Sequence, residues 1–231
     1  MKLVSSNTKQ QFFITATDTD AGKTHVAQLL IRAFVEKGNR VAVFKPISAG
    51  CELINGKLIN DDAQQLLNQS NCKQTIEQVN PIAFKEPIAP HIAAAKLGQS
   101  LNIEEIEESY KDAFRSKSNI LITEGAGGWR LPLGEGIFLS DFVKRNPMKI
   151  ILVVNMKLGC LNHAVLTAES IIEDGLDCVG WVANCPENMD YLEQNIEELK
   201  SLLPMPCIGV VPKQSIETTP NHVLDLSKLS L

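Results

Sequence analysis

Residues 16–24, with the sequence ATDTDAGKT, limit the possible folds more than any other part of the chain. Residues 12–15 are apolar and β-prone, and apolar side chains recur at helical spacing over residues 26–34. A strand, a tight loop and a helix that begins with Gly-Lys-Thr predict a phosphate-binding loop. The unpaired N–H groups and the dipole at the start of the helix favour an anion there. We expect Lys23 to contact the terminal phosphates and the Thr24 hydroxyl to bind Mg²⁺.

The loop departs from the usual glycine pattern at its first position, which is Ala16. Alanine tolerates a positive φ poorly, so this position is expected to have an ordinary backbone conformation. A Gly-Lys-Thr tripeptide also occurs by chance in solvated turns. The strand before it and the helix after it favour a nucleoside-triphosphate site over such a turn.

The size and composition of the chain are typical of a globular α/β protein. The chain has 231 residues, of which 44% are hydrophobic and 21% are charged. We see no domain boundary and expect one domain over residues 1–231, with an open, mostly parallel sheet flanked by helices, of the P-loop NTPase type. Residues 1–11 are polar and are expected to be a flexible lead-in.

Charge and hydropathy argue against two classes of partner. The formal net charge is -5 and no basic block is present, so nucleic acid is not expected as a partner. No apolar run approaches the roughly 20 residues that span a bilayer. The first residues lack the apolar core of a signal peptide, so we expect a cytoplasmic protein without a membrane partner.

The cysteines are spread along the chain without metal-ligand spacing. No two form a Cys-x-x-Cys pair, and no cluster of histidines accompanies them. A zinc site or a disulfide framework is therefore not expected, and the residues are read as reduced thiols. They are Cys51, Cys72, Cys160, Cys178, Cys185 and Cys207.

Two further predicted strands end in charged residues. Residues 41–44 are followed by Lys45, and residues 119–124 end in Glu124, which precedes a glycine-rich turn. Because ligands bind outside the carboxyl ends of parallel strands, both side chains are expected beside the phosphate loop. Glu124 is a suitable ligand for Mg²⁺ or its waters. The alternatives are a surface lysine and a glycine turn that only ends a buried strand.

Several shorter segments have both a structural and a functional interpretation. Asn55-Gly56 predicts a turn within residues 51–58. Asp61 is expected to cap a helix with Asp62 in its first turn, although Asp62 is also a candidate Mg²⁺ ligand. The three prolines of residues 80–91 predict a shaped loop, and we expect His91 to be structural.

The second half of the chain contributes another candidate anion site and a candidate purine contact. Residues 149–154 predict a buried strand, and the following loop, Gly159 to Asn162, precedes a predicted helix over residues 164–173. Simple capping by Asn162 is the alternative. A strand over residues 179–186 includes Asn184, whose amide can pair with a purine edge. Helices are also expected over residues 103–115, capped by Asn102, and 189–203, with a last strand over 207–212.

Taken together, these strand-end motifs resemble the dethiobiotin synthetases, ATP-dependent enzymes of biotin synthesis. The resemblance covers residues 12–212 in family order. The motifs EGAGGW and KLGCLNH are far more specific than a phosphate loop alone. The segments that carry it are residues 17–24, 45–46, 62–63, 90–91, 124–129, 157–163 and 180–184.

The resemblance implies an ATP-dependent ring closure. The substrates are 7,8-diaminononanoate, CO₂ and ATP, and the products are dethiobiotin, ADP and phosphate. One amine becomes a carbamate, ATP phosphorylates the carbamate, and the second amine closes the cyclic urea. The carbamate is anionic, and phosphoryl transfer depends mainly on positioning and charge neutralisation.

The resemblance also implies roles for individual residues. The catalytic residues are Lys45, Lys23 and Thr19, and the Mg²⁺ ligands are Thr24, Asp62 and Glu124. The ATP site is formed by Asp20, Ala21, Gly22, Lys23, Thr24, His25, Asp62, Glu124, Gly125, Ala126, Gly127, Asn184, Cys185, Pro212, Lys213 and Gln214. The substrate site is formed by Thr19, Lys45, Ser48, Ala49, Gly159, Cys160 and Asn162. In the family the last three come from the partner subunit of a homodimer, a common form of assembly.

One departure from the family pattern concerns the substrate. The family usually has Ser or Thr where this chain has Ala49, and the nearest hydroxyl is Ser48. Either Ser48 substitutes through a shifted loop, or one hydrogen bond, worth on the order of 1 kcal/mol, is missing.

Two other functions are compatible with a phosphate loop. A partition or site-selection ATPase uses nucleotide as a dimerisation switch, but it usually has an extra lysine early in the loop, where this chain has Ala16 and Thr17. A non-catalytic nucleotide-binding module is disfavoured because four residues suited to catalysis are all present, namely Lys23, Thr24, Asp62 and Glu124.

Overall fold

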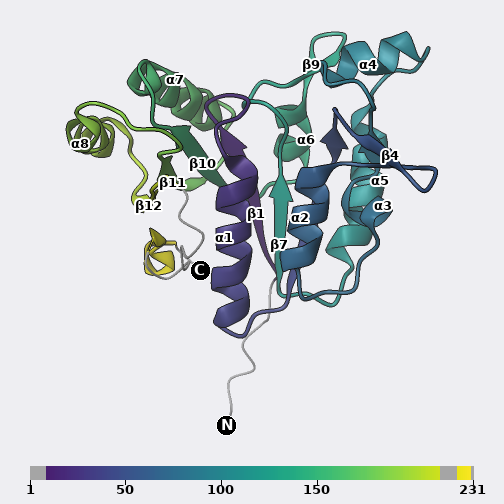
Figure 1. Cartoon of the computed structure of the whole chain (residues 1–231), viewed down its shortest axis with the longest axis horizontal. Helices are drawn as coiled ribbons and strands as arrows, with labels where there is room; N and C mark the ends of the chain where they lie inside the picture. The colour runs from purple at the N-terminus through teal and green to yellow at the C-terminus, as the bar shows by residue number, and fades with distance from the viewer. Residues whose placement is uncertain (1–8, 214–222, 230–231) are drawn as a thin grey trace.

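The computed structural model describes residues 9–213 and 223–229, and its centre is a six-stranded sheet (Figure 1). The strand order is β12-β11-β10-β1-β7-β2, and every neighbouring pair is parallel. The strands are β1 (Gln10–Ala16), β2 (Val41–Phe44), β7 (Ile120–Glu124), β10 (Lys149–Asn155), β11 (Cys178–Asn184) and β12 (Cys207–Val211). The predicted fold class, an open parallel sheet of the P-loop NTPase type, is confirmed.

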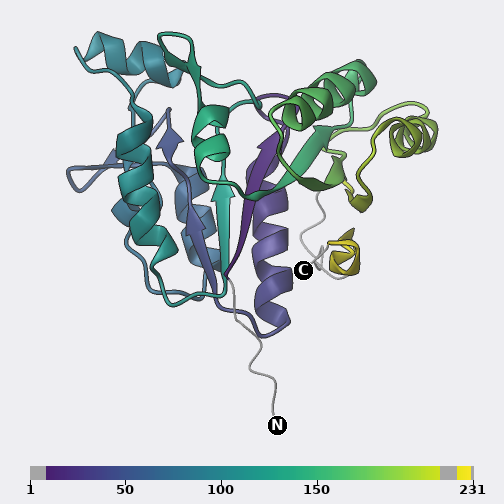
Figure 2. The same cartoon turned by 180° about the vertical axis from the view of Figure 1, so that it is seen from behind.

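Helices cover both faces of the sheet (Figures 1 and 2). One face carries α1 and α2, and the other carries α5, α6 and α7, with α8 packed beside α7. The helices are α1 (Lys23–Glu36), α2 (Asp61–Gln69), α3 (Ile76–Val79), α4 (Pro90–Lys96), α5 (Ile103–Phe114), α6 (Leu139–Arg145), α7 (Cys160–Glu173), α8 (Leu192–Leu202) and the 3₁₀ helix η1 (Leu226–Lys228).

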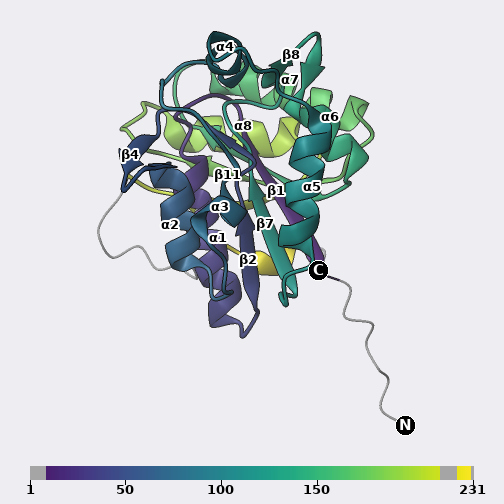
Figure 3. The ribbon, with the colours of Figure 1, turned by 90° about the vertical axis from the view of Figure 1, so that its right-hand side faces the viewer.

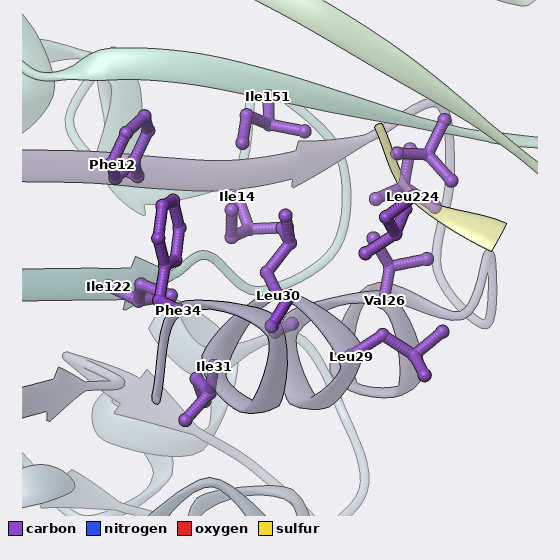
Figure 4. Packing of buried hydrophobic residues seen from close by; sticks show 14 of the residues in the cluster. Phe12, Ile14, Val26, Leu29, Leu30, Ile31, Phe34, Ile122, Ile151 and Leu224 are labelled. Atoms are coloured by element: carbon purple, nitrogen blue, oxygen red, sulfur yellow. The ribbon is translucent and has the colours of Figure 1, made fainter. Parts of the chain in front are cut away.

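Strand β1 lies in the middle of the sheet because its side chains are apolar on both faces. On the α1 face, Phe12 and Ile14 are fully buried, and on the opposite face Phe13 packs edge-on against Trp129. Figure 4 shows Phe12 and Ile14 directed toward Phe34 and Leu30 of α1. The rings of Phe12 and Phe34 stack with their centroids 5.4 Å apart. This packing fixes α1, and with it the phosphate loop, against the sheet.

Three small strand pairs form separate two-stranded sheets outside the central sheet. They are β4 (Glu52–Ile54) with β5 (Lys57–Ile59), β8 (Pro132–Gly134) with β9 (Ile137–Phe138), and β3 (Ile47–Ser48) with β6 (Ile82–Ala83). Asn55 and Gly56 have φ values of 50° and 80°, which confirms the turn expected between β4 and β5. Figure 3 shows this hairpin standing out from the side of the molecule.

Some predicted helix ends are wrong, and the caps give the reason. Asn60, not Asp61, caps α2, because its side chain accepts a hydrogen bond from the Ala63 N–H. Helix α7 begins at Cys160 and not at residue 164, with Gly159 in the left-handed region as its N-cap, so Asn162 does not cap it. Helix α8 begins three residues later than the expected 189. The predicted Asn102 cap of α5 is confirmed by its bond from Glu105 N–H.

The expected lead-in over residues 1–11 is too long. Gln10 and Gln11 already belong to β1 and pair with Ile120 and Leu121 of β7. Residues 1–8 lie outside the described part of the chain. Within residues 9–213 and 223–229, no helix is long and apolar enough to cross a membrane.

Removing the ring that joins α1 to the sheet is expected to destabilise the protein strongly. Phe34 is 1% exposed, so Phe34→Ala leaves a cavity and should lower the free energy of unfolding by about 3–5 kcal/mol. Leu53→Ala is a matched control because Leu53 is 62% exposed in β4, and its effect should stay under about 0.5 kcal/mol. Urea unfolding followed by circular dichroism measures both. Equal losses would contradict this account of the core.

Candidate functional site

A cleft of about 810 Å³ opens at the carboxyl edge of the sheet, next to the start of α1. The phosphate loop, the end of β2, the start of α2 and the glycine-rich loop after β7 all contribute to it. It is lined by Thr19, Asp20, Gly22, Lys23, Thr24, Lys45, Ser48, Ala49, Asn60, Asp62, Pro87, Ile88, Ala89, Pro90, Glu124, Ala126, Gly127 and Leu131. The charged residues expected at this edge therefore do meet in one cavity.

The phosphate loop uses positive φ values at positions other than its first. Ala16 ends β1 in register with Val153 and is not among the residues with a positive φ, as the sequence predicts. The left-handed positions are Asp20, with φ 56°, and Gly22, with φ 84°. Helix α1 starts at the next residue, so its free N–H groups face the cleft. The geometry is that of an anion-binding loop at a helix N-terminus.

The first half of the loop is attached to the end of β10. The Thr17 N–H donates to the Val153 carbonyl at 3.1 Å, and Lys157 forms an ion pair with Asp18 at 3.3 Å. A hydrogen bond from the Thr19 N–H, followed by the Lys157 charge, lowers the pKa of Asp18. These contacts bring the loop at the start of α7 beside the phosphate loop.

Lys45 and three polar side chains from other elements form one cluster. The Lys45 Nζ lies 2.6 Å from Glu124 Oε1 and 3.4 Å from Asp62 Oδ2. The Thr24 hydroxyl donates to the same Glu124 oxygen at 2.8 Å. The side chains of Lys45 and Glu124 are only 4% and 1% exposed, whereas that of Asp62 is 46% exposed. The ion pair is therefore buried on one side and open to the cleft on the Asp62 side.

The two lysines experience opposite pKa shifts. Burial alone would lower the pKa of Lys45, but Glu124 and Asp62 outweigh it and raise the pKa above its ordinary value. Burial lowers the pKa of Lys23, whose nearest charges include both Glu124 and the like charge of Lys45. Lys23 Nζ contacts the Asp18 carbonyl at 3.3 Å. Lys45 is thus held as a cation.

The residues expected to hold Mg²⁺ fit that ion. Thr24, Asp62 and Glu124 provide the oxygen ligands that a hard cation prefers. Glu124 Oε2 is buried and has no hydrogen-bond partner among the described residues. A buried carboxylate oxygen without a partner is costly unless another group occupies its lone pairs. The remaining ligands of Mg²⁺ would be water and phosphate oxygens, which is usual for this ion.

The Ser48 hydroxyl lies in the cleft, but its proton is already used. Ser48 Oγ donates to Asn80 Oδ1 at 2.6 Å, and the Asn80 amide donates to the Lys45 carbonyl at 2.7 Å. Ala49 lines the same wall. Cys51 Sγ lies 3.1 Å from the same oxygen and can donate to it, so Ser48 offers a substrate one lone pair and not a donor.

The remaining predicted residues within the described ranges do not line the cleft. Ala21, Gly125 and Cys185 are buried, and His25 lies in the first turn of α1, where burial lowers its pKa. Burial also raises the pKa of Cys185 to about 11, which opposes thiolate chemistry there. Gly159, Cys160 and Asn162 start α7, and Pro212 and Lys213 follow β12. Gln214 lies outside the described residues.

Sequence reasoning missed part of the cleft wall. Asn60, Leu131 and residues 87–90 line it, although only the shape of the proline-rich loop was expected. The signal for residues 87–90 was the proline spacing, because a rigid loop next to a strand end is a natural wall. Asn60 and Leu131 carry no such signal.

Neutralising one partner of the buried ion pair is expected to destabilise the fold. Glu124→Gln leaves Lys45 buried with only the half-exposed Asp62, so the free energy of unfolding should fall by about 3 kcal/mol. In a Lys45→Met background the same change should have a much smaller effect. Asp62→Asn is the control and should lower it by under about 1 kcal/mol. Urea unfolding at neutral pH measures this, and equal effects of Glu124→Gln in both backgrounds would refute the coupling.

Solved structures share the fold at low sequence identity. A ParA family ATPase from Chlorobium tepidum is 13% identical and has a TM-score of 0.54 over 90% of this chain and 86% of that one. The signal recognition particle receptor FtsY from Elizabethkingia anophelis is 12% identical, with a TM-score of 0.50 over 98% of this chain and 67% of that one. These similarities support the architecture alone.

Sequence comparisons identify much closer relatives. A family model described as an AAA domain matches residues 10–221. The protein called ATP-dependent dethiobiotin synthetase BioD is 47% identical in Alteromonas mediterranea, covering 89% of this chain and 93% of that one. The protein of that name in Pseudomonas aeruginosa is 42% identical over 95% and 98%, and the one in Pseudoalteromonas translucida is 42% identical over 88% and 90%. The similarity extends along nearly the whole of both chains, and the chain therefore belongs to the family of ATP-dependent dethiobiotin synthetases.

Proposed function

We propose that the chain converts 7,8-diaminononanoate, CO₂ and ATP to dethiobiotin, ADP and phosphate, a step of biotin biosynthesis. The observation that carries this proposal is the meeting of Lys23, Lys45, Thr24, Asp62 and Glu124 in one cleft at the phosphate loop. The relatives named ATP-dependent dethiobiotin synthetase support the choice of reaction.

The reaction has three bond-forming steps. One amine nitrogen adds to CO₂ and loses a proton, which gives a carbamate. A carbamate oxygen then attacks the γ-phosphorus of ATP, the bond to the bridging oxygen breaks, and ADP leaves. The second amine attacks the carbonyl carbon of the carbamic-phosphoric anhydride and loses a proton to solvent, and phosphate leaves with the bonding electrons as the ring closes. Phosphate is a far better leaving group than hydroxide.

The two lysines provide fixed positive charge for the anionic steps. Lys45 is held as a cation on the cleft wall, so it can stabilise both the carbamate and the transferring phosphoryl group. Lys23 stands at the start of α1, where it contacts the terminal phosphates. Mg²⁺ held by Thr24, Asp62 and Glu124 would neutralise charge on the phosphate oxygens. Thr19 in the cleft wall is assigned to the substrate amines.

The substrate carboxylate is assigned to the start of α7 of a partner subunit. Gly159, Cys160 and Asn162 do not line the cleft of their own chain. Leu158 beside them is 95% exposed and Leu166 on α7 is 57% exposed, which suits a surface covered by a second copy. A homodimer with shared sites accounts for both observations.

The adenine is assigned to the β11–β12 end of the site. Asn184, Cys185 and the segment that follows β12 through Pro212, Lys213 and Gln214 form this part of the proposal. The Asn184 amide offers both a donor and an acceptor to a purine edge. The proposal includes a single domain and a cytoplasmic location.

The switch-ATPase alternative has weaker support. The similarity to a ParA family ATPase is 13% in sequence, against 42–47% for the dethiobiotin synthetases. The loop has Ala16 and Thr17 where a switch ATPase usually has its extra lysine. A switch ATPase would also hydrolyse ATP without a small diamine.

ADP formation is expected to require the diamine and bicarbonate together. In a coupled ADP assay, omission of either one should reduce the rate to background. Lys45→Ala should abolish ring closure in a protein that still folds, and Lys45→Gln should do little better because it lacks the charge. Lys111→Ala, on the exposed face of α5, is the control and should keep full activity. ATP turnover that ignores the diamine would favour the switch instead, and a near-normal rate for Lys45→Ala would refute its role.

Mixed dimers test whether the site is shared. Lys23→Ala and Asn162→Ala homodimers should each be nearly inactive, because every site lacks one group. In a mixed dimer one site lacks both groups and the other lacks neither. Random mixing of equal amounts should therefore restore about a quarter of the wild-type rate, by the symmetry of a two-fold dimer. No recovery after verified subunit exchange would show that both residues act within one chain.

A further inference from the structure

Asn184 makes a contact with the phosphate loop that the adenine assignment does not require. Its Nδ2 donates to the Ala21 carbonyl at 2.9 Å, and the residue is 4% exposed at the end of β11. The Asn184 backbone is fixed as well, because its carbonyl accepts from the Met156 N–H at 2.8 Å. The amide therefore projects from a rigid strand end onto the middle of the loop.

The loop is closely fitted to this amide. A Cβ atom built on Gly22 would lie 2.1 Å from Asn184 Nδ2, far inside contact distance. Gly22 also has a φ of 84°, which a side chain disfavours. Two independent requirements thus call for glycine at this position, and one of them is the presence of Asn184.

The direction of the Ala21 carbonyl matters for anion binding. A phosphate loop works because its N–H groups point at the ligand, so its carbonyls must point away and find donors elsewhere. Ala21 is fully buried, so bulk water is not available as that donor. Asn184 provides the donor. Rotating the amide would place its oxygen against the carbonyl oxygen, so the bond also fixes which way the amide faces.

We propose that Asn184 is a positioning residue for the phosphates of ATP, in addition to its assigned contact with adenine. By holding the Ala21 carbonyl away from the cleft, it keeps the neighbouring N–H groups directed at the phosphates. Without this bond the Ala21 peptide is free to turn its carbonyl toward the anion, which repels it. This inference rests on the proposed function, because it assumes that the loop binds a nucleoside triphosphate.

Inorganic triphosphate separates the two roles because it has no base. Calorimetric titration of the full chain with triphosphate and Mg²⁺ should show binding to the wild type and about fivefold to tenfold weaker binding to Asn184→Ala, the loss expected for one hydrogen bond. Asn184→Asp keeps the size but loses the donor, so it should weaken binding at least as much. Asn155→Ala is the matched control: Asn155 is level with Asn184 on β10, and its side chain shows no hydrogen bond within the described parts of the chain.

The outcomes separate this inference from the proposed function. If Asn184→Ala binds triphosphate as tightly as the wild type but binds ATP more weakly, Asn184 contacts only the adenine base. This result would overturn the inference. A wild-type protein that binds ATP and triphosphate but forms no dethiobiotin would overturn the proposed reaction and leave the role of Asn184 standing. Equal weakening by Asn155→Ala would also overturn the inference, because the effect would then not depend on the Ala21 contact.

A second measurement tests the contact without any ligand. Gly22→Ala should lower the melting temperature of the wild type through both the collision with Asn184 and the strained φ. In the Asn184→Ala background the collision is gone, so Gly22→Ala should cause a clearly smaller loss of melting temperature. Additive losses in the double variant would show that the two residues act independently and would overturn the inference.

Discussion

The buried ion pair between Lys45 and Glu124 is the interaction on which the site depends. The two residues stand at the ends of neighbouring strands, and the pairing of Phe44 with Thr123 brings those ends level. Neither charge is tolerable alone at this depth, because burying an unpaired ion is expensive. The parallel pairing of β2 with β7 is therefore what allows a permanent cation and a carboxylate to face a ligand together, and Thr24 extends the same group into α1.

The conformation of the phosphate loop depends on β10 and β11, which lie on the opposite side of β1 from β7 and β2. Its first half is held by Val153 and Lys157 from β10 and the loop after it, and its second half by Asn184 from β11. The charged groups thus come from β2, β7 and α2, while the conformation of the loop is maintained from β10 and β11. The central position of β1 makes this division possible, because the loop that follows β1 lies between the two halves.

Local sequence patterns were enough to predict the site residues that lie at the ends of strands. Lys45 and Glu124 could be placed together because each follows a short apolar run, and parallel strands end at one edge. The same patterns failed to predict features that depend on tertiary contacts. Asn60 and Asp61 are both good caps, and only the structure shows that Asn60 takes the Ala63 N–H. The contact of Asn184 with Ala21 joins residues far apart in the chain, so no local pattern could indicate it.

The cleft wall at residues 48–49 has its hydroxyl on Ser48 and a methyl group on Ala49, which limits the ligand groups that this wall can bind. The Ser48 proton is committed to Asn80, whose amide in turn holds the Lys45 carbonyl. What remains for a ligand is a lone pair, which can accept from an amine but can offer nothing to a carbamate or phosphate oxygen. In the proposed reaction, then, Ser48 would face a nitrogen of the diamine, and the oxygens of the carbamate would belong to Lys45. Under that proposal the wall would present an acceptor to the amine at Ser48 and a cation to the carbamate at Lys45.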